Sequence, residues 1–198
     1  MAEKDVFVLG INGSPHKNGH GVKFLRRALA QARLEGARTT IRHLVDINLA
    51  YHNGQYTTKT PPGADELFRI IAGADALILS SPTRWYNVSD LMKNFLDHLT
   101  VFEMRGFKLE GKVFGLIATC EDDGGQACLE KMTSMLYHQG MVGAPYAMYY
   151  HNITMARHSE NRWQEIDSTL LGGNVVRFAR RVRVDQPQPW DYKWLVKL

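Results

Sequence analysis

Short apolar runs alternate with amphipathic stretches along most of the chain. Runs rich in β-branched, aromatic and other apolar residues predict buried strands at residues 6–11, 39–46, 74–81, 112–119 and 145–150. Apolar residues at helical spacing predict helices that begin near Val22, Ala64, Val88 and Leu129, and a last helix over residues 163–182. Strands that alternate with helices at this spacing predict a parallel sheet covered by helices on both faces.

The stretch from Val6 to Gly21 is the most informative part of this pattern. Its apolar strand runs into a loop of small, amide and hydroxyl residues with one fixed positive charge, Lys17, and the imidazoles of His16 and His20. Backbone N–H groups of such a loop can surround an anion where a helix begins, because the helix dipole favours negative charge there. The loop predicts a phosphate site, although its glycine spacing matches no standard nucleotide fingerprint, and a plain βα connection stays an alternative.

Two further loops follow predicted strands and belong at the same edge of the sheet. Residues 82–88 carry Trp85 and Tyr86, whose broad apolar faces can stack beside a planar ring. Residues 119–126 offer backbone amides around two glycines, which can hydrogen-bond a polar ring edge. In an open doubly wound sheet, ligands bind outside the C-terminal ends of the strands. The three loops are therefore predicted to converge on one planar ligand that carries a single phosphate.

Length and composition narrow the class of protein. A chain of 198 residues with 44% hydrophobic content fits one α/β domain, and it has no apolar run long enough to cross a bilayer. The N-terminus lacks an apolar signal region, so we expect a cytoplasmic protein. The net charge of +4 is too mild to indicate a nucleic-acid partner.

Candidate metal ligands are sparse in this sequence. Cys120 and Cys128 are too few for a disulfide scaffold and form no metal-type pair. His151 and His158 lack a third ligand at metal spacing, so we interpret them as surface residues. No metal site is expected.

Three segments together resemble the flavodoxin-like NAD(P)H-dependent FMN reductase and quinone reductase family. They are GSPHKNG before the first helix, SSPTRWYNVSDLMKNFLDHL after the third strand, and the glycine-containing loop after the fourth. The similarity covers about residues 5–140, and S-P-x-x-W-x-x-x-S-x-x-x-K-x-F-x-D is its most specific part. The resemblance implies an α/β three-layer sandwich with a five-stranded parallel sheet in the order 2-1-3-4-5. It also implies a homodimer or homotetramer with the active site near a subunit interface.

The same resemblance implies FMN as cofactor and NADPH or NADH as electron donor. The residues expected around the FMN phosphate are Ser14, His16, Lys17, Asn18, Gly19, His20 and Gly21. Those expected beside the flavin ring are Pro82, Thr83, Arg84, Trp85, Tyr86 and Asn87, with Thr119, Gly124 and Gly125 near its pyrimidine side. The flavin carries the chemistry, so no protein nucleophile or base is required. Arg84 and Tyr86 are candidates for orienting the substrate.

The chain departs from the family pattern at three places. Gly21 stands where relatives usually carry a threonine whose hydroxyl meets the phosphate. The loop LAYHNGQY has no cysteine, whereas the iron–sulfur branch of the family carries a cysteine cluster there, so no such cluster is expected. The loop 121–123 is unusually acidic; its carboxylates would oppose flavin reduction by about 1 kcal/mol each if they face the ring. A solvated acidic turn that points away from the ring is the alternative.

The expected function is electron transfer from NAD(P)H through FMN to a quinone, a free flavin or a similar small acceptor. The alternative is a one-electron carrier of the flavodoxin type, or a flavin-binding regulator with little turnover. The positive net charge counts against an acidic carrier. We assign residues 1–184 to an FMN-binding domain and 185–198 to a C-terminal tail whose aromatic residues would dock on the domain or on a partner subunit.

Overall fold

The computed structural model describes residues 5–157 and 163–182, and in these ranges five parallel strands form one sheet. The strands are β1 (Phe7–Asn12), β2 (Arg38–His43), β3 (Ala76–Pro82), β4 (Val113–Cys120) and β5 (Val142–Asn152). Their order is β2-β1-β3-β4-β5, which confirms the expected flavodoxin-like arrangement. Two strand predictions were inaccurate in extent: the segment 39–46 ends in a single 3-10 turn, η1 (Leu44–Asp46), and β5 is longer than predicted at both ends.

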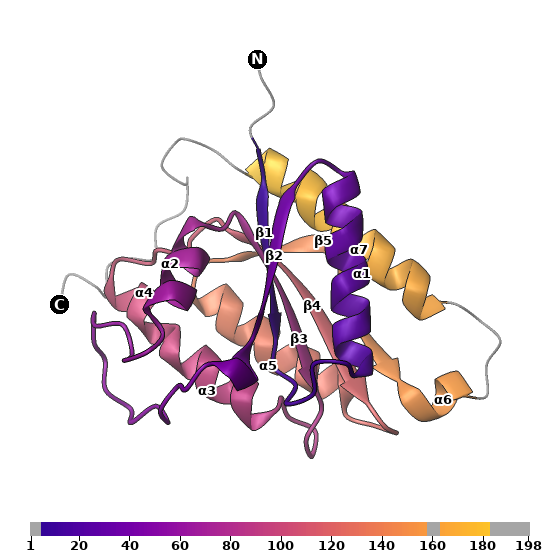
Figure 1. The fold of residues 1–198 in the computed structure, drawn as a ribbon, viewed down its shortest axis with the longest axis horizontal. Helices are drawn as coiled ribbons and strands as arrows, with labels where there is room; N and C mark the ends of the chain where they lie inside the picture. The colour runs from indigo at the N-terminus through magenta and orange to yellow at the C-terminus, as the bar shows by residue number, and fades with distance from the viewer. Residues whose placement is uncertain (1–4, 158–162, 183–198) are drawn as a thin grey trace.

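Helices cover both faces of the sheet (Figure 1). On one face lie α1 (His20–Leu34) and α7 (Trp163–Val182), side by side. On the other face lie α2 (Asp65–Gly73), α3 (Asp90–His98), α4 (Thr100–Met104) and α5 (Gly125–His138), and a short helix, α6 (Ile153–Arg157), follows β5. The apolar stripe predicted as one helix after Val88 is thus divided at Leu99 into α3 and α4.

Alternating side chains of the central strands supply two separate cores. Leu77 and Leu79 of β3 pack with the helices α2 to α5, whereas Ala76 and Ile78 pack with α1 and α7. The close approach of α7 to α1 depends on Gly172, since a Cβ at that position would lie 2.0 Å from the carbonyl oxygen of an α1 residue. Burial on both faces explains why the strands appear as continuous apolar runs.

This arrangement leaves the loops after β1, β3 and β4 at one edge of the sheet (Figure 1). None of the helices within the described ranges is both long and apolar enough to span a bilayer. The predicted C-terminal tail, residues 185–198, lies outside the described residues.

Candidate functional site

The loop after β1 is held against the start of α3. The Gly13 N–H donates to the carbonyl oxygen of Ser80 at 2.8 Å, and the Ser89 hydroxyl donates to the carbonyl oxygen of Gly13 at 2.6 Å. Ser89 also caps α3, because its side-chain oxygen accepts from the N–H of Met92 at 3.1 Å. One serine therefore both begins a helix and fixes the position of the first loop.

A buried asparagine, Asn12, closes the same loop from the other side. Its Oδ1 accepts from the N–H of Ser14 at 3.1 Å, and its Nδ2 donates to the carbonyl oxygen of Ser14 at 3.1 Å and to Nδ1 of His43 at 3.0 Å. Because an amide nitrogen only donates, Nδ1 of His43 acts as an acceptor and the ring is neutral. Burial lowers the pKa of His43, against the opposing effect of the Asp46 carboxylate. Neither Asn12 nor His43 was predicted as a site residue, since they are 31 positions apart in the chain.

The start of α1 leaves backbone donors available for an anion. The N-cap residue, Gly19, provides no side-chain hydrogen bond, and the carbonyl oxygen of Gly19 accepts from the N–H of Lys23. The N–H groups of the preceding positions, His20, Gly21 and Val22, therefore have no partner within the helix. An uncapped helix N-terminus of this kind favours a phosphate group.

Gly21 lies at the inner side of this first helical turn, where two hydroxyl groups approach it. A Cβ at position 21 would lie 2.7 Å from the side-chain oxygen of Ser80 and 3.7 Å from that of Thr119. The hydroxyls of Ser80 and Thr119 can therefore donate the hydrogen bond that a threonine at position 21 would provide. Ser80 was missed because it lies in an otherwise apolar strand and is 1% exposed; the only signal in the sequence is the polar pair that ends that strand.

The basic side chains of the first loop lie at the surface. Lys17 forms an ion pair with Asp46 of η1, so that carboxylate offsets part of its charge. His16, Asn18 and His20 are exposed. The structure therefore places these side chains around the start of α1, with backbone N–H groups and hydroxyls on its inner side.

His151 is buried, and its prediction as a surface residue was wrong. It is 4% exposed because β5 extends to Asn152, and its ring packs edge-on against Phe24 of α1 with the ring centroids 4.7 Å apart. Its Nδ1 has no hydrogen-bond partner within the described part of the chain, and the ring of His20 lies 5.7 Å away. Burial, and secondly His20, lower the pKa of His151. His158, the other histidine of that prediction, lies outside the described residues.

The second loop forms a tight turn with a strained backbone. Arg84 and Asn87 exchange two backbone hydrogen bonds, of 2.8 and 2.9 Å, around Trp85 and Tyr86. The φ angles of Trp85 and Tyr86 are +45° and +61°, values that favour glycine or asparagine and are costly for a bulky aromatic residue. Trp85 is 97% exposed, so packing does not compensate for the strain. Strain of this kind concentrates at functional sites.

The third loop is fixed against that turn. The hydroxyl of Tyr86 donates to Oδ2 of Asp123 at 3.1 Å, and this bond raises the pKa of Tyr86. The N–H of Gly124 donates to Oδ1 of the same carboxylate at 2.8 Å. The second and third loops also meet at Thr83, whose N–H donates to the carbonyl oxygen of Thr119 at 2.7 Å, next to the pairing of Pro82 with Thr119 in the sheet.

Two glycines allow the third loop to pack this closely. Gly124 has a φ of +83°, and a Cβ there would lie 3.0 Å from the Cα of Tyr86. A Cβ on Gly125 would lie 2.4 Å from the ring of Tyr150. The helix α5, which begins at Gly125, has no side-chain cap, and the N–H groups of Gln126 and Ala127 in its first turn have no partner within the helix.

The three residues of the acidic loop make different contacts. Glu121 pairs with Arg157 of α6 at 3.2 Å, and the carbonyl oxygen of Asp122 accepts from the side chain of Asn152. Only Asp123, among these three, hydrogen-bonds the aromatic turn. The hypothesis of an electrostatic effect on a flavin is therefore tested first at Asp123.

The geometry fits a flavin mononucleotide. One side of the edge offers the uncapped start of α1 with the hydroxyls of Ser80 and Thr119, which suits a phosphate. The other side offers the aromatic turn and the uncapped start of α5, which suit a planar ring with a polar edge. No group of three or more histidine, cysteine, aspartate or glutamate side chains in residues 5–157 and 163–182 is placed to hold a metal ion.

Comparison with known proteins agrees with this geometry. The chain is 34% identical over 151 residues to an NAD(P)H dehydrogenase (quinone) of Paracoccus denitrificans, an alignment that covers 72% of this chain and 69% of the relative. It is 27% identical over 158 residues to an iron-sulfur flavoprotein of Archaeoglobus fulgidus, covering 74% of this chain and 75% of that protein. An NAD(P)H dehydrogenase (quinone) of Acidithiobacillus ferrooxidans is 32% identical over 134 residues, covering 60% of this chain and 64% of the relative.

Solved structures share the fold at low sequence identity. RosB with bound 8-demethyl-8-formylriboflavin-5'-phosphate has a TM-score of 0.73 at 17% identity, covering 90% of this chain and 80% of that chain. The NADH:FMN oxidoreductase EMOB in its apo form has a TM-score of 0.63 at 20% identity, covering 92% of each chain. The family model described as NADPH-dependent FMN reductase matches residues 6–153, a range that contains all three converging loops. The chain therefore belongs to the NADPH-dependent FMN reductase family.

Proposed function

We propose that this FMN-dependent oxidoreductase passes electrons from NADPH or NADH to a quinone, a free flavin or a similar small acceptor. Family membership makes it an oxidoreductase with FMN as cofactor and a nicotinamide nucleotide as donor. The observation that carries the proposal is the meeting of an uncapped helix N-terminus with an exposed aromatic turn at one edge of the sheet. A phosphate and a planar ring can occupy that edge together.

The first loop would hold the phosphate mainly through backbone N–H groups. These groups belong to His20, Gly21 and Val22, and the hydroxyls of Ser80 and Thr119 lie beside Gly21. Since Lys17 already pairs with Asp46, we expect the fixed charge of this loop to add little to phosphate affinity. Backbone N–H groups do not titrate in the neutral pH range, so these donors should stay available to the phosphate there.

The second loop would position the reacting partner. When bound, FMN supplies the redox chemistry, and the protein supplies orientation and the exclusion of water. Trp85 and Tyr86 present aromatic faces at the edge, and the exposed guanidinium of Arg84 lies on the same turn. These three side chains would contact a nicotinamide nucleotide or a small aromatic acceptor.

The test combines a spectrum with turnover. The purified protein should bind FMN, show its visible absorption and oxidise NADPH or NADH in the presence of a quinone or free flavin. A protein that binds FMN but leaves NADPH and NADH unconsumed with all of these acceptors would be an electron carrier or a regulator, and the proposal would be wrong.

We further propose that the protein forms a homodimer or homotetramer in the cytoplasm. Tyr146, Met148 and Tyr150 are 70%, 43% and 48% exposed on the edge strand β5, and apolar side chains of this kind are typical of subunit contacts. Cys120 and Cys128 are both free thiols, as in a reducing compartment. Sedimentation equilibrium that returns the monomer mass of 22.5 kDa at micromolar concentration would contradict the oligomer.

A further inference from the structure

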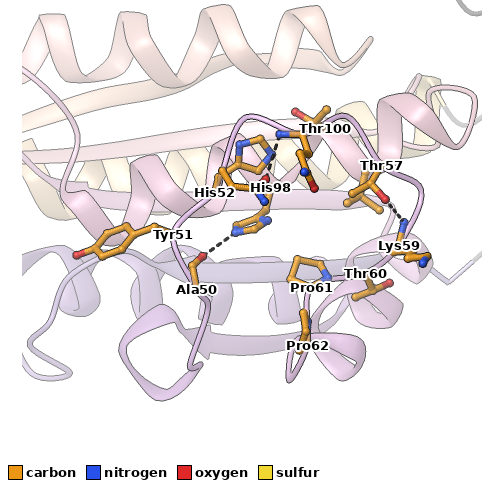
Figure 2. A pocket seen from close by; sticks show the side chains of 13 residues that line it. Ala50, Tyr51, His52, Thr57, Lys59, Thr60, Pro61, Pro62, His98 and Thr100 are labelled. Carbon is orange, nitrogen blue, oxygen red and sulfur yellow. Dashed lines mark hydrogen bonds between the residues drawn. The ribbon is translucent and has the colours of Figure 1, made fainter.

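The long segment 47–64 lines a cavity that contains no residue of the three loops. The cavity has a volume of about 270 Å³, and its lining includes Ala50, His52, Lys59, Pro61 and His98. Figure 2 shows the two histidines at one end of the cavity and Thr57 with Lys59 at the other. The helix α3 joins the two sites: Ser89 caps it at the first loop, and His98 is its last residue, about 13 Å farther at 1.5 Å per residue.

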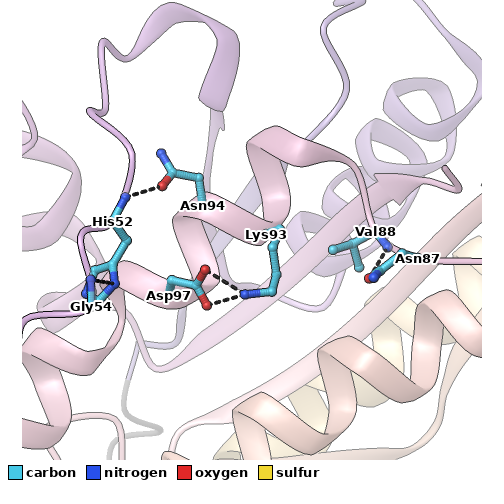
Figure 3. A network of polar contacts seen from close by, with 7 residues as sticks. All are labelled: His52, Gly54, Asn87, Val88, Lys93, Asn94 and Asp97. Atoms are coloured by element: carbon cyan, nitrogen blue, oxygen red, sulfur yellow. Dashed lines mark hydrogen bonds and ion pairs between the residues drawn. The ribbon is translucent and has the colours of Figure 1, made fainter.

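The first half of this segment is anchored along α3. Oδ1 of Asn94 accepts from the N–H of His52 at 2.9 Å, as Figure 3 shows, and its Nδ2 donates to the carbonyl oxygens of Leu49 and Ala50 at 3.1 and 3.0 Å. Nε2 of the buried His98 also donates to the carbonyl oxygen of Ala50, at 2.8 Å. These bonds hold the histidine end of the cavity in place.

The second half is anchored by one arginine. Arg105, which follows α4, donates from Nε to the carbonyl oxygen of Thr58 at 2.8 Å and from a terminal nitrogen to the hydroxyl of Thr60 at 2.8 Å. Lys59 lies between these two anchored residues. The cavity is therefore bounded by chain that is tied to α3 and α4 at both ends, and its shape exists before any ligand binds.

The cavity presents hydrogen-bond donors that the protein does not use. Nδ1 of His52 accepts from the N–H of Gly54 at 3.1 Å, so the ring hydrogen of the neutral form lies on Nε2. Within residues 5–157 and 163–182, Nε2 of His52 has no hydrogen-bond partner, and no carboxylate pairs with the ammonium group of Lys59. The exposed ammonium group of Lys59 and Nε2 of the half-buried His52, at opposite ends of the cavity (Figure 2), are thus each open to an acceptor of a ligand.

The charge of the cavity is positive. Its lining includes Lys59 and two histidines but no aspartate or glutamate. The carboxylate next to His98 in the chain, Asp97, is bound at 2.6 Å by Lys93 on the same helix (Figure 3). Arg105 adds a second fixed positive charge at the wall, since it donates to neutral groups there. A negatively charged group therefore suits this cavity.

We propose that this cavity binds a small molecule that carries a phosphate or carboxylate group on a compact apolar or planar body. Lys59 would bind the anionic group at one end of the cavity, Nε2 of His52 would donate to an acceptor atom of the body at the other end (Figure 2), and the proline rings at positions 61 and 62 with Val101 would contact the body. One source is a free phosphate or carboxylate compound. The other, which rests on the proposed function, is the 2′-phosphate end of NADPH whose nicotinamide would lie at the flavin edge, since the cavity lies at the C-terminal end of α3, about 13 Å along the helix from the first loop.

The experiment measures binding of adenosine 2′,5′-bisphosphate and of inorganic phosphate to FMN-saturated protein by calorimetry. The variants are Lys59→Gln and His52→Gln, with Lys131→Gln as the matched control, since Lys131 is an exposed lysine on α5. Loss of the charge-assisted contact in Lys59→Gln should weaken the bisphosphate at least about tenfold, loss of the Nε2 donor at the other end in His52→Gln should also weaken it, and the control should bind it as the original protein does.

Kinetic constants then distinguish the two sources. If Lys59→Gln also raises KM for NADPH and leaves KM for NADH unchanged, the cavity receives the 2′-phosphate of the donor. If both KM values stay unchanged while the bisphosphate is weakened, the cavity takes a free anion. If neither probe binds, or if the three variants bind equally well, the proposal is wrong. The binding assay involves no turnover, so its failure differs from a failure of the proposed oxidoreductase activity.

Discussion

Replacing Trp85 with asparagine should make the protein more stable and less active. Trp85 has a φ of +45° and is 97% exposed, so its side chain gains almost nothing from burial while its backbone is strained. The left-handed conformation costs a non-glycine residue about 1–2 kcal/mol, and asparagine adopts it at the lowest cost among residues with a side chain. The first central position of this turn type favours asparagine for the same reason.

The expected gain can be converted to a melting temperature. Relief of most of 1–2 kcal/mol corresponds to an increase of about 2–8 °C in Tm for a chain of this length. Thermal unfolding should be followed on FMN-free protein, because a ligand that binds only the folded state adds its own stabilisation. The same substitution removes an aromatic face worth about 0.5–1.5 kcal/mol in stacking, so kcat/KM for NADPH should fall roughly two- to tenfold.

The control is Trp85→Phe, which keeps the aromatic face and the strain. It should match the original protein in both Tm and kcat/KM. If Trp85→Asn leaves Tm unchanged, the turn is not strained in the way its φ angles indicate. If Tm rises and kcat/KM does not fall, the turn is strained for a reason unrelated to the reaction.

Three further predictions concern the loops around the site. Burial lowers the pKa of His43 below its ordinary value of 6.5, so the neutral ring stabilises the fold above that pH, and this stabilisation is lost as the pH falls through the lowered pKa. Chemical denaturation at pH 7.5 and at pH 5 should show the loss in the free energy of unfolding, and His43→Gln should make the loss smaller. Gly21→Ala places a methyl group 2.7 Å from the side-chain oxygen of Ser80 and should cost about 1–3 kcal/mol of stability, which the double variant with Ser80→Ala should largely restore in thermal unfolding. Asp123→Asn should raise the midpoint potential of bound FMN, by on the order of 1 kcal/mol per electron. Glu121→Gln should leave the potential unchanged, because Glu121 pairs with Arg157. If spectroelectrochemical titration gives Asp123→Asn the same potential as the original protein, the Asp123 carboxylate does not act on the flavin.

Much of the fold could be predicted from local patterns. Continuous apolar runs such as residues 74–81 indicate strands buried on both faces, and amphipathic spacing indicates the helices between them, because hydrophobic period is a property of neighbouring residues. The cap of α3 at Ser89 is a local feature of the same kind, since a cap acts on residues two or three positions away. The order of the strands came from a resemblance to a family, as periodicity carries no information about which strands pair.

Contacts between distant residues could not be predicted in this way. Asn12 meets His43 because parallel pairing of β1 with β2 places these two residues opposite each other, and a different register would separate them. The approach of Ser80 to Gly21 and the burial of His151 follow equally from the position of α1 on the sheet.

The sequence by itself determined the alternation of strands and helices, the three loops and their chemical character. Only the tertiary structure decided that Lys17 is paired with Asp46, that Trp85 lies in a strained turn, and that residues 47–64 enclose a positively charged cavity. The physical reason is that hydrophobic patterning acts over a few residues, whereas a binding site depends on distances between residues that only the packed sheet and helices bring together.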